Sequence, residues 1–179
     1  MNNASGSAAS FLGIDLSGPT MRAALVKADG EVIERRESPI EADQLVSKVA
    51  DVVRELRTAH PDIAAVGIAV PGLVNRQTDR VVASRDLPST VREDLHSEFM
   101  DATGLRVEIE NDANAAAYGE YIVGAGSGSR DMFYVTIGEG IGGAIILDGK
   151  LWTGASGFAG EVGHITIDTE GVECECGNV

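Results

Sequence analysis

Short apolar runs separated by turn residues occupy the first forty positions, and this pattern predicts β-strands. The sequence predicts strands over residues 11–16, 21–27 and 31–37. Turn residues stand between the runs, and Asp29-Gly30 is among the strongest signals for a hairpin. We therefore expect three adjacent, antiparallel strands in this region.

The apolar period lengthens further along the chain. Between residues 42 and 59 apolar side chains recur every three or four positions, which is the stripe of an amphipathic helix. A near-continuous apolar run at 63–70 is typical of a strand buried on both faces. A second helix is expected at 90–103, a strand at 106–110 and an Ala-rich helix at 113–123. This alternation predicts an α/β fold with a mixed sheet and flanking helices.

The composition changes near residue 124, where glycine and serine predict a turn or linker. A new strand–turn–strand pattern begins at residue 132 and echoes the pattern that begins at residue 11. We therefore expect a flexible leader over residues 1–10 and an N-terminal α/β domain over 11–123. Residues 124–179 are expected to form the start of a second α/β domain.

An excess of acidic side chains restricts the classes of partner. The 179 residues include 14 basic and 28 acidic side chains, a formal net charge of −14. Such a surface repels phosphate backbones and anionic lipids, so we expect no nucleic-acid partner and no membrane partner. The two cysteines lie one residue apart, which suits a metal site or thiol pair better than a structural disulfide. With no signal-peptide pattern at the N-terminus, a cytoplasmic location is expected.

Two glycine-rich bends between apolar runs are candidate phosphate loops. Asp15 and Gly18 belong to the first bend, and Gly138, Gly140 and Gly142 belong to the second. Such bends can direct several backbone N–H groups at a phosphate, and an aspartate at a strand end can hold hydrated Mg²⁺. The alternative is a plain β-hairpin in which Asp15 is only a turn acceptor, and either bend taken alone favours this alternative.

An acidic turn follows the strand expected at residues 106–110. Ligands of open α/β sheets bind at the carboxyl ends of strands, so Asp112 is placed to accept a proton from a substrate hydroxyl. Asn111 is placed to orient the same hydroxyl. The competing interpretation is that Asn111 or Asp112 only caps the following helix.

Three side chains near the C-terminus have the character of zinc ligands. His164, Cys174 and Cys176 form an H-x₉-C-x-C pattern, whereas a structural zinc site uses four ligands. The other two histidines, His60 and His96, lie in or beside the expected surface helices, and we expect both to be solvated.

Four segments in a fixed order make the sequence similar to the ROK family, named for repressor, open reading frame and kinase. They are GIAVPG at 67–72, Glu-Asn-Asp at 110–112, the long glycine-rich segment at 138–165 and CECGN at 174–178. The third resembles the family signature, and the fourth resembles the opening of its C-x-C-G-x-x-G-C-x-E zinc motif. The resemblance extends from Phe11 to the last residue.

The resemblance implies an actin-like ATPase fold of the hexokinase type, which is ribonuclease H-like, with two α/β domains about a cleft. It implies that Asp112 is the base that deprotonates a sugar hydroxyl. It also implies that Asn111, Glu161 and His164 bind the sugar, and we expect these residues to converge in one cleft.

The same resemblance implies the cofactors ATP, Mg²⁺ and a structural Zn²⁺. The zinc would be held by His164, Cys174 and Cys176. The nucleotide would lie against the two phosphate loops, which contain Asp15, Gly18, Gly138, Gly140 and Gly142.

Three features depart from the pattern of the family's kinases. The chain ends inside the zinc motif, so a third cysteine and most of the second domain are missing, and we expect a truncated part of a longer protein. The first loop has Ser17 and Pro19 where kinases have D-x-G-G-T. Glu139 places a carboxylate in the second loop, where kinases have G-T-G. Both loops therefore resemble those of the family's sugar-responsive repressors.

Two functions follow from this pattern. The first is an ATP-dependent hexose kinase, glucokinase-like, with a small-molecule sugar and ATP as partners and a homodimer as the assembly considered. The alternative is a sugar-sensing domain without phosphoryl transfer. Ten residues before Phe11 are too few for a helix-turn-helix, which favours the enzyme. Ser17, Pro19 and Glu139 favour the sensor.

Overall fold

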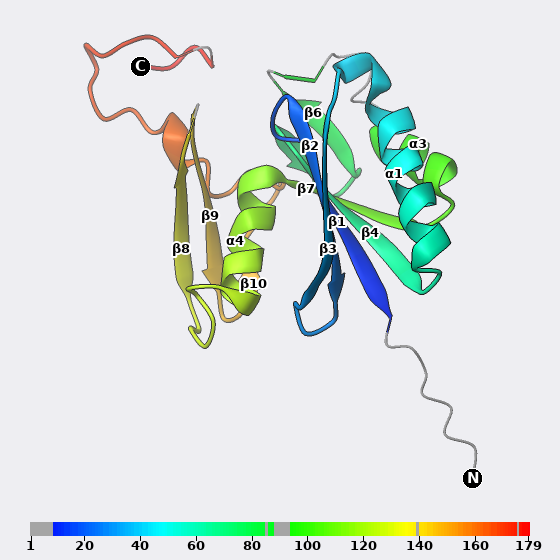
Figure 1. The fold of residues 1–179 in the computed structure, drawn as a ribbon. Helices are drawn as coiled ribbons and strands as arrows, with labels where there is room; N and C mark the ends of the chain where they lie inside the picture. The colour runs from blue at the N-terminus through cyan, green and yellow to red at the C-terminus, as the bar shows by residue number, and fades with distance from the viewer. Residues whose placement is uncertain (1–8, 85, 88–93, 139, 175) are drawn as a thin grey trace. The chain divides into compact units, whose positions relative to one another are not determined.

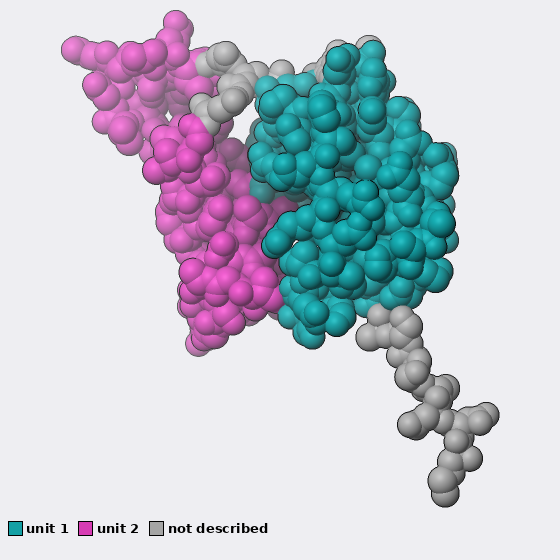
Figure 2. Space-filling view, in the orientation of Figure 1, with its two compact units in different colours: residues 1–112 teal, residues 113–179 magenta. Residues whose placement is uncertain are grey.

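The computed structural model divides the chain into two compact units, residues 1–112 and 113–179, which Figure 2 colours separately. The residues described are 9–84, 86–87, 94–138, 140–174 and 176–179 (Figure 1). Each unit contains its own sheet. The domain boundary expected at residue 124 stays a prediction.

The first unit is built on a five-stranded mixed sheet with the order β3-β2-β1-β4-β7. Its strands are β1 (Ser10–Asp15), β2 (Thr20–Lys27), β3 (Val32–Pro39), β4 (Ile63–Val70) and β7 (Arg106–Asn111). The pairs β1–β2 and β2–β3 are antiparallel, whereas β1–β4 and β4–β7 are parallel. The three antiparallel strands and the mixed sheet predicted from the sequence are therefore confirmed.

Two helices cover one face of this sheet (Figure 1). A short 3-10 turn, η1 (Ala42–Gln44), leads into α1 (Leu45–Ala59), and α3 (Leu95–Thr103) packs beside α1. Gly104 ends α3 in the left-handed region, as expected for a glycine at a helix C-terminus. The first residues of the helix expected at 90–103 lie outside the described residues.

The core lies between these helices and the strands, and alternate strand residues point into it. Its most enclosed side chains, each under 2% exposed, include Leu12, Leu25, Val49, Val53, Val66, Val70, Leu95 and Phe99.

A short hairpin that the sequence pattern did not indicate follows β4. It consists of β5 (Leu73–Asn75) and β6 (Arg80–Ala83), which pair in antiparallel fashion. The Asn75 side chain accepts hydrogen bonds from the backbone N–H groups of Gln77 and Thr78 and so shapes the turn. Each strand is too short to show an alternating pattern.

The second unit is a three-stranded antiparallel sheet with the order β10-β9-β8 and an adjoining helix. Its elements are α4 (Asp112–Val123), β8 (Met132–Ile137), β9 (Ile141–Leu147), β10 (Lys150–Leu151) and η2 (Val162–His164). The strand–turn–strand predicted from residue 132 is confirmed. No helix in the described part of the chain is long and apolar enough to cross a membrane.

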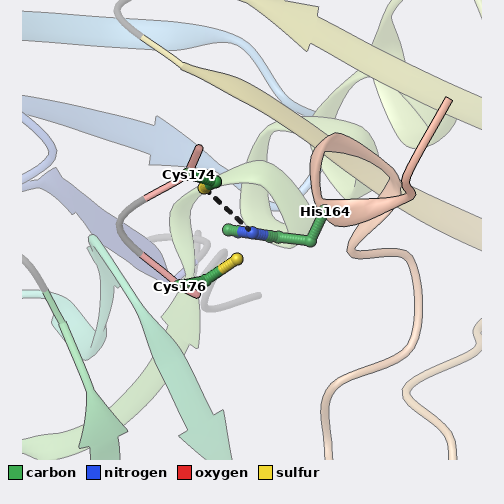
Figure 3. Close-up of side chains that lie close together, drawn as sticks. All are labelled: His164, Cys174 and Cys176. Carbon is green, nitrogen blue, oxygen red and sulfur yellow. Dashed lines mark hydrogen bonds between the residues drawn. The ribbon is translucent and has the colours of Figure 1, made fainter. Parts of the chain in front are cut away.

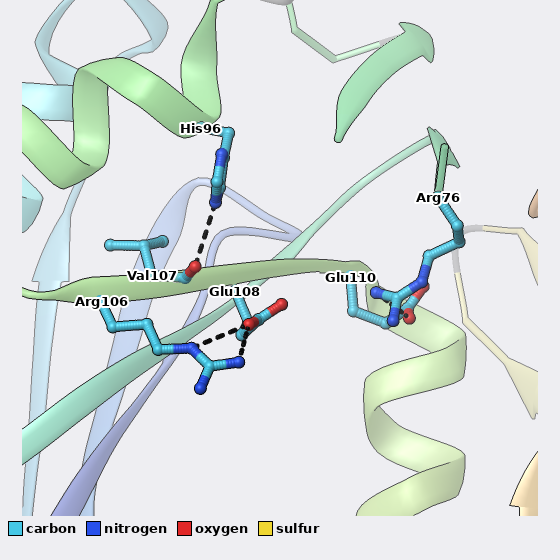
Figure 4. A network of polar contacts seen from close by, with 6 residues as sticks. All are labelled: Arg76, His96, Arg106, Val107, Glu108 and Glu110. Atoms are coloured by element: carbon cyan, nitrogen blue, oxygen red, sulfur yellow. Dashed lines mark hydrogen bonds and ion pairs between the residues drawn. The ribbon is translucent and has the colours of Figure 1, made fainter. Parts of the chain in front are cut away.

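The prediction that His60 and His96 are solvated was wrong, because both rings have polar protein partners and are part-buried. Nε2 of His60 lies 3.2 Å from a carboxylate oxygen of Glu34. Nε2 of His96 lies 3.0 Å from the carbonyl oxygen of Val107 (Figure 4). The physical reason in the second case is that α3 packs against β7, so a polar helix residue meets a strand carbonyl.

The core predicts a contrast between two neighbouring residues of α3. Phe99 is fully buried, and Met100 is 40% exposed. Phe99→Ala should lower the free energy of unfolding by about 3–5 kcal/mol, because it removes transfer energy and leaves a cavity. Met100→Ala should lower it by about 1 kcal/mol or less. Equilibrium denaturation measures both, and equal losses would contradict this assignment of the core.

Candidate functional site

Parallel pairing brings the carboxyl ends of three strands of the first unit to one edge. Asp15 of β1 is in register with Ala69 of β4, which is in register with Glu110 of β7. The segments that follow these three strands therefore leave the sheet together. Ligands of open α/β sheets bind at such an edge, so it is the natural place for a functional site.

The junction between β7 and α4 carries the acidic turn predicted from the sequence. The side-chain amide of Asn111 donates to the carbonyl oxygen of Gly72 and to a carboxylate oxygen of Asp112, both at 3.0 Å. Asn111 thus connects the end of β4 to Asp112 and orients its carboxylate. A helix starts at Asp112, as predicted.

Gly72 has a backbone conformation that other residues rarely adopt. Its φ is +119°, and a Cβ atom at this position would lie 2.2 Å from the carbonyl oxygen of Ala83. The close approach of the β5–β6 hairpin therefore requires glycine here. This geometry directs the carbonyl of Gly72 towards Asn111.

An ion pair that the sequence analysis missed lies beside this junction (Figure 4). Nη1 of Arg76 lies 3.1 Å from Oε2 of Glu110, whose side chain is 19% exposed. The other carboxylate oxygen, Oε1, accepts the backbone N–H of Asn111 at 2.9 Å. No motif identified Arg76, because it lies in the turn of the unpredicted hairpin.

The first glycine-rich bend joins β1 to β2. Oδ1 of Asp15 accepts the backbone N–H of Ser17 at 2.9 Å, and Oδ2 pairs with Arg22 at 3.1 Å. The turn-acceptor interpretation of Asp15 is therefore realised in the structure. A Cβ atom on Gly18 would meet no other atom within 4 Å, so the bend is open there. That Asp15 and Gly18 bind a magnesium nucleotide stays a prediction.

The second glycine-rich bend joins β8 to β9. The backbone N–H of Gly138 donates to the carbonyl oxygen of Gly140 at 2.9 Å, which closes the turn. A Cβ atom on Gly142 would lie 3.1 Å from Cβ of Ala113, so this glycine also allows close packing of α4 against β9. Glu139, which we expected to repel phosphates, lies outside the described residues.

His164, Cys174 and Cys176 come together in the second unit (Figure 3). Their ligand atoms all lie within 4.8 Å of one another, and Nδ1 of His164 lies 3.9 Å from Sγ of Cys174. Two thiols and an imidazole are ligands that Zn²⁺ prefers. Nε2 of His164 lies 3.9 Å from a carboxylate oxygen of Glu161, which is beyond hydrogen-bond distance. The donor set therefore fits zinc.

Hydrogen bonds shape the Cys-x-Cys segment and attach it to η2. The N–H of Cys174 donates to the carbonyl oxygen of Asn178 at 2.7 Å, and the N–H of Gly177 donates back to Cys174. The side-chain amide of Asn178 donates to the carbonyl oxygen of His164 at 3.1 Å. The bond from Asn178 links the two parts of the candidate metal centre.

The structure groups the predicted sugar-binding residues into two pairs. Asn111 and Asp112 are in direct contact at the strand edge of the first unit. Glu161 and His164 lie together in the second unit. Their convergence in one cleft stays a prediction.

Three protein ligands predict weak metal binding by the 179-residue chain, because a structural zinc site uses four. A chelator should remove Zn²⁺, and Cys176→Ser should weaken binding further. His96→Gln changes a histidine outside the cluster and should leave the affinity unchanged. Competition with a chromophoric chelator measures the affinity, and stoichiometric zinc that survives the chelator would contradict the prediction.

Comparison with known proteins identifies close similarity to sugar kinases and to regulators. The ROK family profile matches residues 11–179. A glucokinase from Streptomyces coelicolor is 37% identical over 169 residues, which cover 93% of this chain and 53% of the relative. A xylose repressor from Bacillus subtilis is 33% identical over 174 residues, which cover 93% of this chain and 45% of the repressor.

A solved structure agrees with this relationship. The ROK family glucokinase from Streptomyces griseus, in complex with glucose and AMPPNP, is 34% identical and has a TM-score of 0.84. The match covers 94% of this chain and 54% of that one. The chain therefore spans about half the length of the relatives that it matches.

The mixed sheet with flanking helices is the actin-like ATPase fold of the solved ROK sugar kinases, as expected. Since the family profile matches nearly the whole sequence, the chain belongs to the ROK family.

Proposed function

We propose that the intact protein is an ATP-dependent sugar kinase, glucokinase-like, that phosphorylates a hydroxyl group of a hexose. The observation that carries the proposal is the carboxylate of Asp112, which Asn111 orients at the carboxyl edge of the parallel strands. The similarity to glucokinases over 93% of this chain supports it. ATP and a small-molecule sugar are the proposed partners.

In this proposal Asp112 acts as general base. Its carboxylate accepts the proton of a sugar hydroxyl while the hydroxyl oxygen forms a bond to the γ-phosphorus of ATP. The bond from the γ-phosphorus to the bridging oxygen breaks, and ADP leaves. The hydrogen bond from Asn111 keeps the carboxylate in one orientation, and such positioning accounts for much of phosphoryl-transfer catalysis.

The remaining proposed contacts follow the family resemblance. Glu161 and His164 would bind the sugar. The nucleotide would lie against the two loops that contain Asp15, Gly18, Gly138, Gly140 and Gly142. Mg²⁺ that arrives with ATP would neutralise phosphate charge. A cytoplasmic location and a homodimer belong to the same proposal.

A second candidate is a sugar-sensing domain without phosphoryl transfer. The carboxylate of Asp15, which would face Mg²⁺ in a kinase, already pairs with Arg22 and with the N–H of Ser17. The similarity to a xylose repressor also favours this candidate. Sugar would then bind at Asp112 without reaction.

Replacement of the proposed base separates the two candidates. In the intact protein, Asp112→Asn should lower kcat by about 10²–10⁴-fold with little change in sugar affinity, because it removes the base and keeps the shape of the side chain. Asp101→Asn, at an exposed position of α3, is the matched control and should leave kcat unchanged.

The measurements are hexose-dependent ADP formation over a panel of sugars and calorimetric sugar binding. Binding of a sugar without turnover of any sugar would replace the kinase proposal with the sensor.

The carboxylate of Glu139 predicts weakened nucleotide binding. Two like charges about 4 Å apart in water repel by about 1 kcal/mol. Glu139→Thr should therefore tighten ATP binding about fivefold. Titration calorimetry with ATP and Mg²⁺ measures the change, and an unchanged or weaker affinity would show that this carboxylate does not face the phosphates.

A further inference from the structure

We propose that Arg76 is a positioning residue that acts on Asp112 through Glu110 and Asn111. The proposal rests on the proposed function, because the role of Asp112 does. Arg76 lies in the turn between β5 and β6, outside the four motifs quoted for the family resemblance. Arg76 reaches the junction of β7 and α4 through its ion pair with Glu110.

The contacts form a continuous series. Nη1 of Arg76 pairs with Oε2 of Glu110 at 3.1 Å, and Oε1 of Glu110 accepts the backbone N–H of Asn111 at 2.9 Å. The side chain of Asn111 then donates to Asp112 at 3.0 Å. We expect a change at Arg76 to reach the carboxylate of Asp112 through Glu110 and Asn111, the two residues that precede it in sequence.

The same hairpin contacts the junction at two points. At its base, the carbonyl oxygen of Gly72 accepts the amide of Asn111 at 3.0 Å. In its turn, Arg76 engages Glu110. Asn75 shapes this turn by accepting two backbone N–H groups. The hairpin therefore contacts Asn111 directly through Gly72 and contacts its neighbour Glu110 through Arg76.

Charge and burial give the Arg76 contact its importance. Glu110 and Asp112 are two carboxylates separated in sequence by Asn111, and the side chain of Glu110 is only 19% exposed. A carboxylate with so little access to water needs a cation or several hydrogen-bond donors nearby. We expect loss of the guanidinium to weaken the hold on Oε2 of Glu110 and so to loosen the hydrogen bond from the N–H of Asn111 to Oε1.

One competing role for Arg76 must be distinguished. The Arg76 side chain is 42% exposed, so it is also accessible to a ligand. An arginine that touches the sugar directly would act independently of Glu110. A positioning arginine would lose its effect once Glu110 is neutral.

The experiment compares variants of the intact protein. Arg76→Gln removes the charge, Arg76→Lys keeps it, and Glu110→Gln removes its partner. The double variant Arg76→Gln with Glu110→Gln closes a double-mutant cycle. Arg80→Gln is the matched control, because Arg80 lies on the same hairpin and pairs with Asp94 at 3.9 Å.

Two readouts are needed. The first is the separation of kcat from KM for the sugar. Arg76→Gln should lower kcat by about 10²-fold, as expected for misplacement of a catalytic group, and change KM by less than about threefold. Arg76→Lys should restore most of the rate. Arg80→Gln should match the wild type.

The second readout needs neither sugar nor ATP. The side-chain amide signals of Asn111 in a nitrogen–proton correlation spectrum should shift in Arg76→Gln and in Glu110→Gln. The double variant should show no larger shift than Glu110→Gln alone, and Arg80→Gln should show none. Unchanged Asn111 signals in Arg76→Gln would overturn the proposal.

The two readouts separate this proposal from the proposed function. If Arg76→Gln shifts the Asn111 signals but the wild-type protein shows no turnover, Arg76 is supported as a positioning residue and the proposed kinase activity is overturned. In an active protein, an unchanged kcat in Arg76→Gln would overturn the positioning role. If Arg76→Gln lowers kcat in the Glu110→Gln background by as much as it does in the wild type, the positioning role is also overturned, in favour of direct contact between Arg76 and the sugar.

Discussion

The parallel pairing of β1, β4 and β7 is the constraint on which the first unit depends. It aligns Asp15, Ala69 and Glu110 in one row. The carboxyl ends of the three strands, and the segments that follow them, therefore lie at one edge of the sheet. The same strands present alternate apolar residues to α1 and α3, so the core that stabilises the unit also determines the register of the edge. A slip by one residue would expose the core and displace the acidic turn at the same time.

The strand periods and turn signals were sufficient to predict this architecture, because each long element has one buried face. The helix at 45–59 and the strand at 63–70 were predicted within a few residues. The hairpin formed by β5 and β6 was missed, because strands of three and four residues show no reliable alternation. His60 and His96 were misassigned for a different reason, since their partners come from distant strands that sequence spacing does not indicate.

The candidate site was predictable where residue type alone carries the chemistry. Asp112 at a strand end and the His164, Cys174 and Cys176 cluster follow from local sequence and from the family resemblance. Arg76 was not predictable, because its importance comes from a pairing with Glu110 across 34 positions of chain, through a hairpin that had to be seen first. The carboxylate of Asp15 pairs with Arg22, a partner that the motif did not indicate.

The central claim is that Asp112 faces a sugar hydroxyl at the edge of the parallel strands. A crystal structure of the intact protein with bound glucose tests it most directly. The account predicts a glucose hydroxyl within about 2.6–3.2 Å of the carboxylate of Asp112, the range required of a general base. It also predicts that Glu161 and His164 contact the same sugar. Glucose bound away from Asp112, with the carboxylate only capping α4, would contradict the account.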